Sequence, residues 1–118
     1  MRDHRERLTA ELADAESRVA GLAAGLAEIK AASKSSNADD EHDPEGATIA
    51  FERQQLSALL DGARRTAADL RAALAQLDSG GYGTCRHCGR SIATERLEAR
   101  PQATACIECA RRQGRMTR

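Results

Sequence analysis

Residues 33–46 read SKSSNADDEHDPEG, a run of turn-forming and acidic residues that separates two segments with a helical repeat. In both segments apolar residues recur at alternating spacings of four and three, the seam of a coiled-coil helix. The first seam consists of Leu8, Leu12, Ala15, Val19, Leu22, Leu26 and Ile29. The second consists of Leu56, Leu60, Ala63, Ala67, Leu70, Leu74 and Leu77. A turn-rich break between matching seams predicts that the second helix folds back on the first.

An antiparallel pairing of the seams places Leu26 opposite Leu60 and Leu8 opposite Leu77, with several small residues facing larger ones. The midpoint of this pairing falls within residues 37–46, so the acidic stretch would be the tip of a helical hairpin. The alternative for heptads of this length is a parallel coiled coil of two chains.

The expected helix ends follow from the chemistry of free backbone groups. Asp3 is predicted to cap the first helix, because a short acidic side chain accepts hydrogen bonds from the first turn. Pro44 is predicted as the first residue of the second helix, with Asp43 as its cap. That helix should stop at Gly80 and Gly81.

The composition excludes a large globular core. The chain has 118 residues with only 2% aromatic side chains, and such chains need a staple or an elongated helical architecture. The longest uncharged run of the helical part, residues 19–27, is far shorter than the roughly 20 residues that span a bilayer. The charged N-terminal stretch does not resemble a secretory signal, so a soluble, cytoplasmic protein is expected.

Four cysteines form two C-x2-C pairs, Cys85 with Cys88 and Cys106 with Cys109, and 17 residues separate the pairs. This spacing is typical of a four-cysteine zinc site. Two such turns can direct four thiolates to one tetrahedral ion, and Gly89 frees the backbone after the first pair. One structural zinc ion is therefore predicted. Zinc with four thiolate ligands has no open position, which argues against catalysis.

Three other interpretations of the cysteines fit the sequence less well. Two disulfides would need an oxidising compartment, and nothing indicates secretion. A redox-active C-x2-C would need a thioredoxin-like surrounding. His87 is a poorer ligand candidate because four cysteines are available, and His4, His42 and His87 are predicted to be ordinary surface residues. The sequence contains no hydrolase triad, phosphate-binding loop or HExxH motif, so no catalytic residue is predicted.

Charge is unevenly distributed, although 18 basic and 18 acidic residues balance overall. Residues 37–46 carry a net charge of −5 from five acids, and residues 86–118 carry +5 from eight arginines and three glutamates. The acids are Asp39, Asp40, Glu41, Asp43 and Glu45. Such a dipole would orient itself in the field of a charged partner. Alternatively, the acids are only solvated, and the arginines are solvated or bind nucleic acid.

Residues 81–109 read GYGTCRHCGRSIATERLEARPQATACIEC. They resemble the DksA/TraR family of bacterial transcription factors, above all in RLEARP between the cysteine pairs. The resemblance implies a mainly α fold: an antiparallel helical hairpin (coiled coil) with its acidic tip over residues 1–79, and a four-cysteine zinc finger with a short C-terminal helix over residues 80–118. It implies bacterial RNA polymerase as the partner, with no direct binding of DNA. No membrane partner is expected, since the uncharged runs are short.

Family members insert the hairpin through the secondary channel of the polymerase, and the tip acids act near the catalytic magnesium. Some members act together with the alarmone ppGpp. The family pattern at the tip is D-x-x-D-x-A; Asp43 matches its first position, whereas Gly46 and Thr48 occupy the other two. The resemblance therefore favours polymerase binding and leaves the effect on initiation and the response to ppGpp open. A nucleic-acid-binding zinc protein that uses its arginine-rich end is the second hypothesis.

Overall fold

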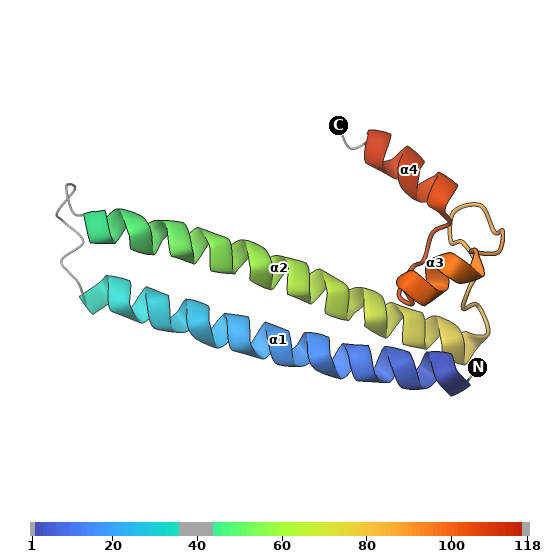
Figure 1. Cartoon of the computed structure of the whole chain (residues 1–118), viewed down its shortest axis with the longest axis horizontal. Coiled ribbons are helices and arrows are strands. Elements are labelled where there is room, and N and C mark those ends of the chain that lie inside the picture. Colours follow the sequence, from blue (N-terminus) through green and yellow to red (C-terminus); the bar gives the residue numbers. More distant parts are fainter. Residues whose placement is uncertain (1, 36–43, 117–118) are drawn as a thin grey trace. The chain divides into compact units, whose positions relative to one another are not determined.

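The computed structural model describes residues 2–35 and 44–116, which form four helices (Figure 1). The helices are α1 (Arg2–Ser35), α2 (Pro44–Ser79), α3 (Thr94–Ala99) and α4 (Ile107–Met116). Within these residues, β-type pairing is limited to an isolated antiparallel bridge between Thr84 and Ser91. The predicted mainly α fold is confirmed. In the described part, every helix is too short or too polar to cross a membrane.

The chain divides into two compact units, and α1 and α2 contribute to both. The first unit combines residues 1–13 with residues 66–118, and the second consists of residues 14–65. In each unit the two helices lie side by side and run in opposite directions (Figure 1). The sequence predicts two domains, with a boundary after residue 79. That boundary divides the chain in another way than these two units do, and it stays a prediction.

The second unit is held together by its coiled-coil seam. Leu26 and Leu60 are 9% and 4% exposed, and each seam position of this unit is buried or half-buried. Leu56 of α2 lies close to the backbone of α1 at Gly25. A methyl group added at Gly25 would lie 3.8 Å from Leu56 Cδ1. The helix pair of this unit is thus an intramolecular antiparallel hairpin, as predicted.

In the first unit the same seam continues, and further contacts close the open end of the hairpin. Leu8 and Leu70 are at most 2% exposed. The Arg5 guanidinium lies 2.5 Å from a carboxylate oxygen of Asp78. Ala73 is 1% exposed although it lies outside the predicted seam, and it lies beside a small hollow that Tyr82 and Ala103 also line. The last turns of α2 are therefore covered by the segment that follows them.

The ends of the helices test the capping predictions. α2 begins at Pro44 and ends at Ser79, as expected. Gly80 adopts a left-handed φ of +85°, which ends the helix. The Gly81 N–H then donates to the Gln76 carbonyl, which would otherwise lack a partner in the last turn. The prediction for Asp3 is wrong: α1 already includes Arg2, so Asp3 lies inside the first turn. The predicted cap Asp43 lies outside the described residues.

Candidate metal centre

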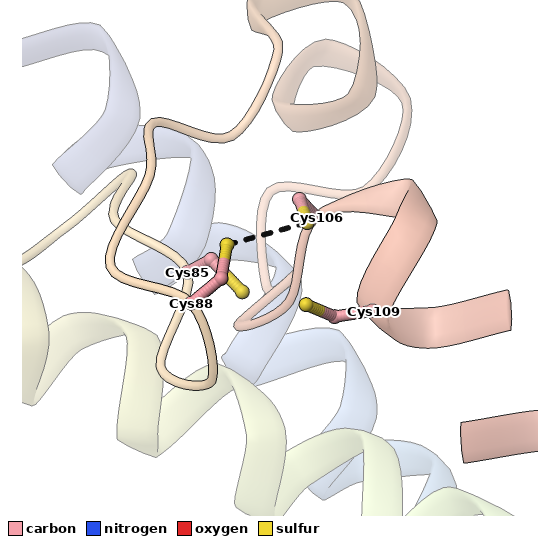
Figure 2. Close-up of side chains that lie close together, drawn as sticks. All are labelled: Cys85, Cys88, Cys106 and Cys109. Carbon is pink, nitrogen blue, oxygen red and sulfur yellow. Dashed lines mark hydrogen bonds between the residues drawn. The ribbon is translucent and has the colours of Figure 1, made fainter. Parts of the chain in front are cut away.

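The four cysteine sulfurs converge on one point (Figure 2). All four Sγ atoms lie within 4.8 Å of one another, and the Sγ atoms of Cys88 and Cys106 are 3.8 Å apart. Four sulfurs placed tetrahedrally at about 2.3 Å from a zinc ion are about 3.8 Å apart. The donor set and its spacing therefore fit a zinc ion with four thiolate ligands.

The first cysteine pair lies on a tight turn between α2 and α3. The Gly89 N–H donates to the Cys85 carbonyl at 2.9 Å, and the Cys85 N–H donates to the Arg90 carbonyl at 2.8 Å. Gly89 has a φ of +76°, a conformation that residues with a Cβ rarely adopt. The role predicted for Gly89 is confirmed: it reverses the chain directly after Cys88, so that both sulfurs of this pair face the same side.

The second cysteine pair lies at the start of α4. Cys106 precedes the helix and Cys109 lies in its first turn, where the Ala110 N–H donates to the Cys106 carbonyl at 2.9 Å. Helical geometry brings side chains three residues apart onto one face, which directs both sulfurs the same way. The Arg86 N–H donates to the Thr104 carbonyl at 2.9 Å and joins the two halves of the site.

The thiols influence each other's ionisation. Backbone hydrogen bonds, the strongest from Cys106 and the next from Cys88, lower the pKa of Cys85 to about 5. The side-chain hydrogen bond with Cys106 and burial raise the pKa of Cys109 to about 12. The site therefore favours the thiolate form of Cys85 and the neutral thiol form of Cys109. A divalent cation bound among the four sulfurs would favour the thiolate form of Cys109 as well, because its positive charge attracts the thiolates.

Side chains around the sulfurs complete the site. The Arg112 guanidinium lies 3.6 Å from Cys109 Sγ. Four thiolates exceed the charge of one Zn²⁺ by two, so a guanidinium next to a sulfur offsets part of the excess. The His87 Nε2 and the Gln113 Nε2 form a 2.7 Å hydrogen bond that ties the first cysteine turn to α4. Sequence reasoning did not identify Arg112 or Gln113, although a basic residue three positions after a cysteine in a helix is a usable signal.

The segment around the cysteines has only a small apolar core. Its buried members are Cys85, Ile92, Leu97, Ala105 and Cys109. Segments of roughly 40 residues seldom fold on such a core without a metal or a disulfide. Two of the five core residues are cysteines, which makes the metal centre part of the core.

Residues of the RLEARP motif (96–101) pack into this core and form hydrogen bonds around it. Leu97 is 8% exposed and Pro101 is fully buried. The Arg96 Nε donates to the Ala105 carbonyl at 2.9 Å, and the Tyr82 hydroxyl donates to the Pro101 carbonyl at 2.9 Å. The motif that carries the family resemblance therefore fixes the loop between the two cysteine pairs.

His4 was expected to be an ordinary surface residue, but it is half-buried and its ring centroid lies 5.1 Å from that of Tyr82. His87 is exposed, as expected, yet bonded to Gln113. The tip acids Asp39, Asp40, Glu41 and Asp43 lie outside the described residues, and of Glu45 only the helical backbone is described.

Comparison with known proteins agrees with this geometry. Residues 80–113 match the family model of the prokaryotic dksA/traR C4-type zinc finger. This segment is a DksA/TraR zinc finger. The resemblance seen in the sequence is thereby confirmed, and together with the clustered cysteines it shows that the finger carries a structural zinc ion.

Curated proteins of the family are similar to this chain over part of their length. The chain is 38% identical over 69 residues to the RNA polymerase-binding transcription factor DksA of Haemophilus influenzae, and 38% identical over 58 residues to that of Caulobacter vibrioides. These alignments cover 56% and 49% of this chain but only 48% and 41% of the relatives. The chain thus matches less than half the length of either curated relative.

Solved structures extend the comparison to the hairpin. The structure of transcription factor DksA2 from Pseudomonas aeruginosa superposes with a TM-score of 0.74 at 26% identity. It covers 97% of this chain and 82% of that protein. The hairpin as well as the finger therefore has the DksA2 architecture.

Proposed function

We propose that this chain is a zinc-containing transcription regulator that binds bacterial RNA polymerase. The proposal depends on two observations taken together. The finger matches the DksA/TraR family model, and 97% of the chain, including the hairpin, superposes on DksA2. Both relatives named DksA are described as RNA polymerase-binding transcription factors. A polymerase partner also places the protein in the cytoplasm.

In this proposal the zinc finger holds the hairpin in position, and the tip of the hairpin acts on the polymerase. Residues 80–118 form the zinc finger, with Cys85, Cys88, Cys106 and Cys109 as the four zinc ligands. Residues 1–79 form the hairpin, whose tip enters the secondary channel and approaches the active site. A long narrow channel admits only the end of such a hairpin, and negative charge there is attracted to basic side chains or to a bound magnesium ion. Catalysis is not part of the proposal, since the zinc has no open position.

The tip acids are the proposed effector residues, and Asp43 is the first candidate among them because it matches the family pattern. Charged oxygens close to the catalytic magnesium can alter how the polymerase holds its substrates and its promoter. The glycine and threonine at positions 46 and 48 differ from that pattern. We therefore propose that binding to the polymerase and the effect on transcription are separable properties. A response to ppGpp would concern the effect on transcription.

The competing function is nucleic-acid binding through the arginine-rich end. Two of the arginines in residues 86–118 already have partners within the finger: Arg96 with the Ala105 carbonyl, and Arg112 with Cys109. Arg86, Arg90, Arg100 and Arg111 are exposed. An exposed basic surface of this kind suits an acidic protein surface as well as it suits a phosphate backbone.

Co-purification with bacterial RNA polymerase tests the proposal directly. The zinc-loaded chain should migrate with core polymerase in size-exclusion chromatography, and a photo-crosslinker at Ala38 should mark polymerase residues that line the secondary channel. The matched measurement is a salt titration against nonspecific DNA, where a nucleic-acid-binding protein shows measurable affinity at physiological salt and a steep loss above it. DNA binding without polymerase binding would replace the first function by the second.

A further inference from the structure

Both helix segments of the second unit contain glycine in their interiors. Gly21 and Gly25 belong to α1, and Gly62 belongs to α2. Glycine weakens a helix more than any residue except proline, because its backbone loses the most conformational freedom on folding. Three interior glycines are explained either by close packing that excludes a larger residue or by a locally weak helix pair.

The packing does not require glycine at any of the three positions. A methyl group added at Gly21 would meet no side chain within 4 Å in the part of the chain that the structure describes. At Gly25 the nearest atom would be Leu56 Cδ1, and at Gly62 the guanidinium of Arg65, both at 3.8 Å, an ordinary van der Waals distance. None of the three glycines has a positive φ. Alanine would therefore fit at each position and would strengthen the helix there.

The three glycines lie close to one level along the hairpin. Leu56 of α2 lies beside Gly25 of α1, and the two helices run in opposite directions (Figure 1). Gly21, about one turn before Gly25, is therefore level with about residue 60 of α2. Gly62 lies about 3 Å further along the same helix. The helix-weakening residues of the two helices thus coincide within about one or two turns.

We name residues 19–25 and 56–63 together the glycine level. The seam packs loosely here, because three of its five seam residues are only half-buried: Val19, Leu22 and Leu56. Ala63 is 6% exposed but contributes only a methyl group, which leaves Leu60, 4% exposed, as the one large buried side chain of these five. Most helix stability in proteins comes from such tertiary packing. The packing therefore offsets little of the stability that the glycines remove.

We infer that the glycine level is a hinge, at which the helix pair opens and bends more readily than in the turns on either side. Local opening of native proteins occurs where buried apolar contacts are few, and low helix propensity adds to it. The turns of this unit nearer the tip can then change direction while the other turns of the seam stay paired. The hinge is a property of the hairpin itself and does not depend on which partner the chain binds.

Amide hydrogen exchange of the intact, zinc-loaded chain tests the hinge. After correction for intrinsic exchange rates, protection of residues 21–25 should be at least about fivefold lower than that of residues 14–18 and 28–31. Each single replacement by alanine, such as Gly21→Ala, should raise protection at the glycine level by about fivefold, and the triple replacement should raise it further. Circular dichroism verifies that the variants keep their helices.

The chain offers a matched control in Gly46, an exposed glycine near the start of α2. Gly46→Ala makes the same chemical change and should leave protection at the glycine level as it is in the parent. Equal protection of the glycine level and the flanking turns in the parent would overturn the inference. So would a triple variant that exchanges like the parent, or a Gly46→Ala variant that protects the glycine level as strongly as the triple variant does.

Discussion

The Tyr82 hydroxyl donates a 2.9 Å hydrogen bond to the carbonyl of Pro101, across 19 residues of chain. Pro101 is fully buried, and Tyr82 also packs against the apolar core of the finger. On its other side the Tyr82 ring contacts His4 of α1. One side chain therefore connects the finger to the N-terminal end of α1 in the first unit.

Replacement of Tyr82 by phenylalanine should destabilise the first unit by about 1 kcal/mol, the net value of one hydrogen bond. The ring remains, so helix content and zinc content should not change. Chemical denaturation followed by circular dichroism measures the difference. An unchanged midpoint and slope would show that the hydroxyl contributes nothing to the fold.

Alkaline pH should weaken the same contact in the parent. Burial, the largest cause, raises the pKa of Tyr82 above its usual 10.0; the positive charge of Arg7 offsets part of this rise and the negative charge of Glu11 adds to it. Because the folded-state pKa is raised, the stabilisation is fully present below pH 10 and is lost as the pH rises through the folded-state pKa. Tyr82 is the only tyrosine and there is no tryptophan, so tyrosinate absorbance reports this one group. A midpoint at or below 10 would contradict the expected direction.

Removal of zinc should unfold the finger while much of the hairpin helix survives. Structural zinc contributes on the order of 10 kcal/mol to folding, and the finger core has few other apolar residues. Protein purified under reducing conditions should hold one zinc per chain, and the double variant Cys85→Ser/Cys109→Ser should hold almost none. Ser91→Ala, an exposed finger position, serves as the control and should keep its metal. A parent without zinc would reject the assignment.

The seam of the hairpin can be tested with two adjacent leucines. Leu60 is 4% exposed and Leu59 is 48% exposed, although both are leucines of the same turn. Leu60→Asp should cost more than about 3 kcal/mol, because it removes a buried side chain and buries a charge. Leu59→Asp should cost less than about 1 kcal/mol. Thermal melting compares the two variants, and similar melting temperatures would contradict the seam.

The proposed tip is tested by removing charge without removing capping ability. Asp43→Asn, alone or with Asp40→Asn, should bind polymerase nearly as the parent does but lose its effect on transcription. Asparagine caps a helix about as well as aspartate, so the start of α2 is preserved. In vitro transcription measures the effect. Variants that regulate like the parent would show that the acids only increase solubility.

The sequence predicted the regular parts of this protein better than the irregular ones. Heptad spacing identified buried positions such as Leu8 and Leu70, because a helix repeats the same environment every few residues. The cysteine spacing and Gly89 identified the metal turn, since both depend on local geometry. Ala73 and Pro101 were missed: they are buried by segments far away in sequence, and no periodicity marks them.

Long-range polar contacts were equally invisible in the sequence. His4 and Tyr82 are separated by 78 positions, and nothing in either neighbourhood indicates that the rings meet. The ion pair of Arg5 with Asp78 spans a similar separation. The ion pair follows from the antiparallel register of the hairpin, whereas the ring contact involves Tyr82, which lies beyond the end of α2 at Ser79. The register was predicted from apolar residues alone, so polar partners could be derived only after the helices had been placed.

The first unit has a consequence for the order in which the chain can fold during synthesis. Its parts are residues 1–13 and residues 66–118, so the earliest-made segment has its partners among the latest. Leu8, 0% exposed in the finished unit, stays uncovered on the ribosome until the second half of the chain has been translated. Residues 14–65 carry both of their helix segments close together in sequence and can pair earlier. Translation therefore completes the hairpin from the inside outwards, and the finger closes it last.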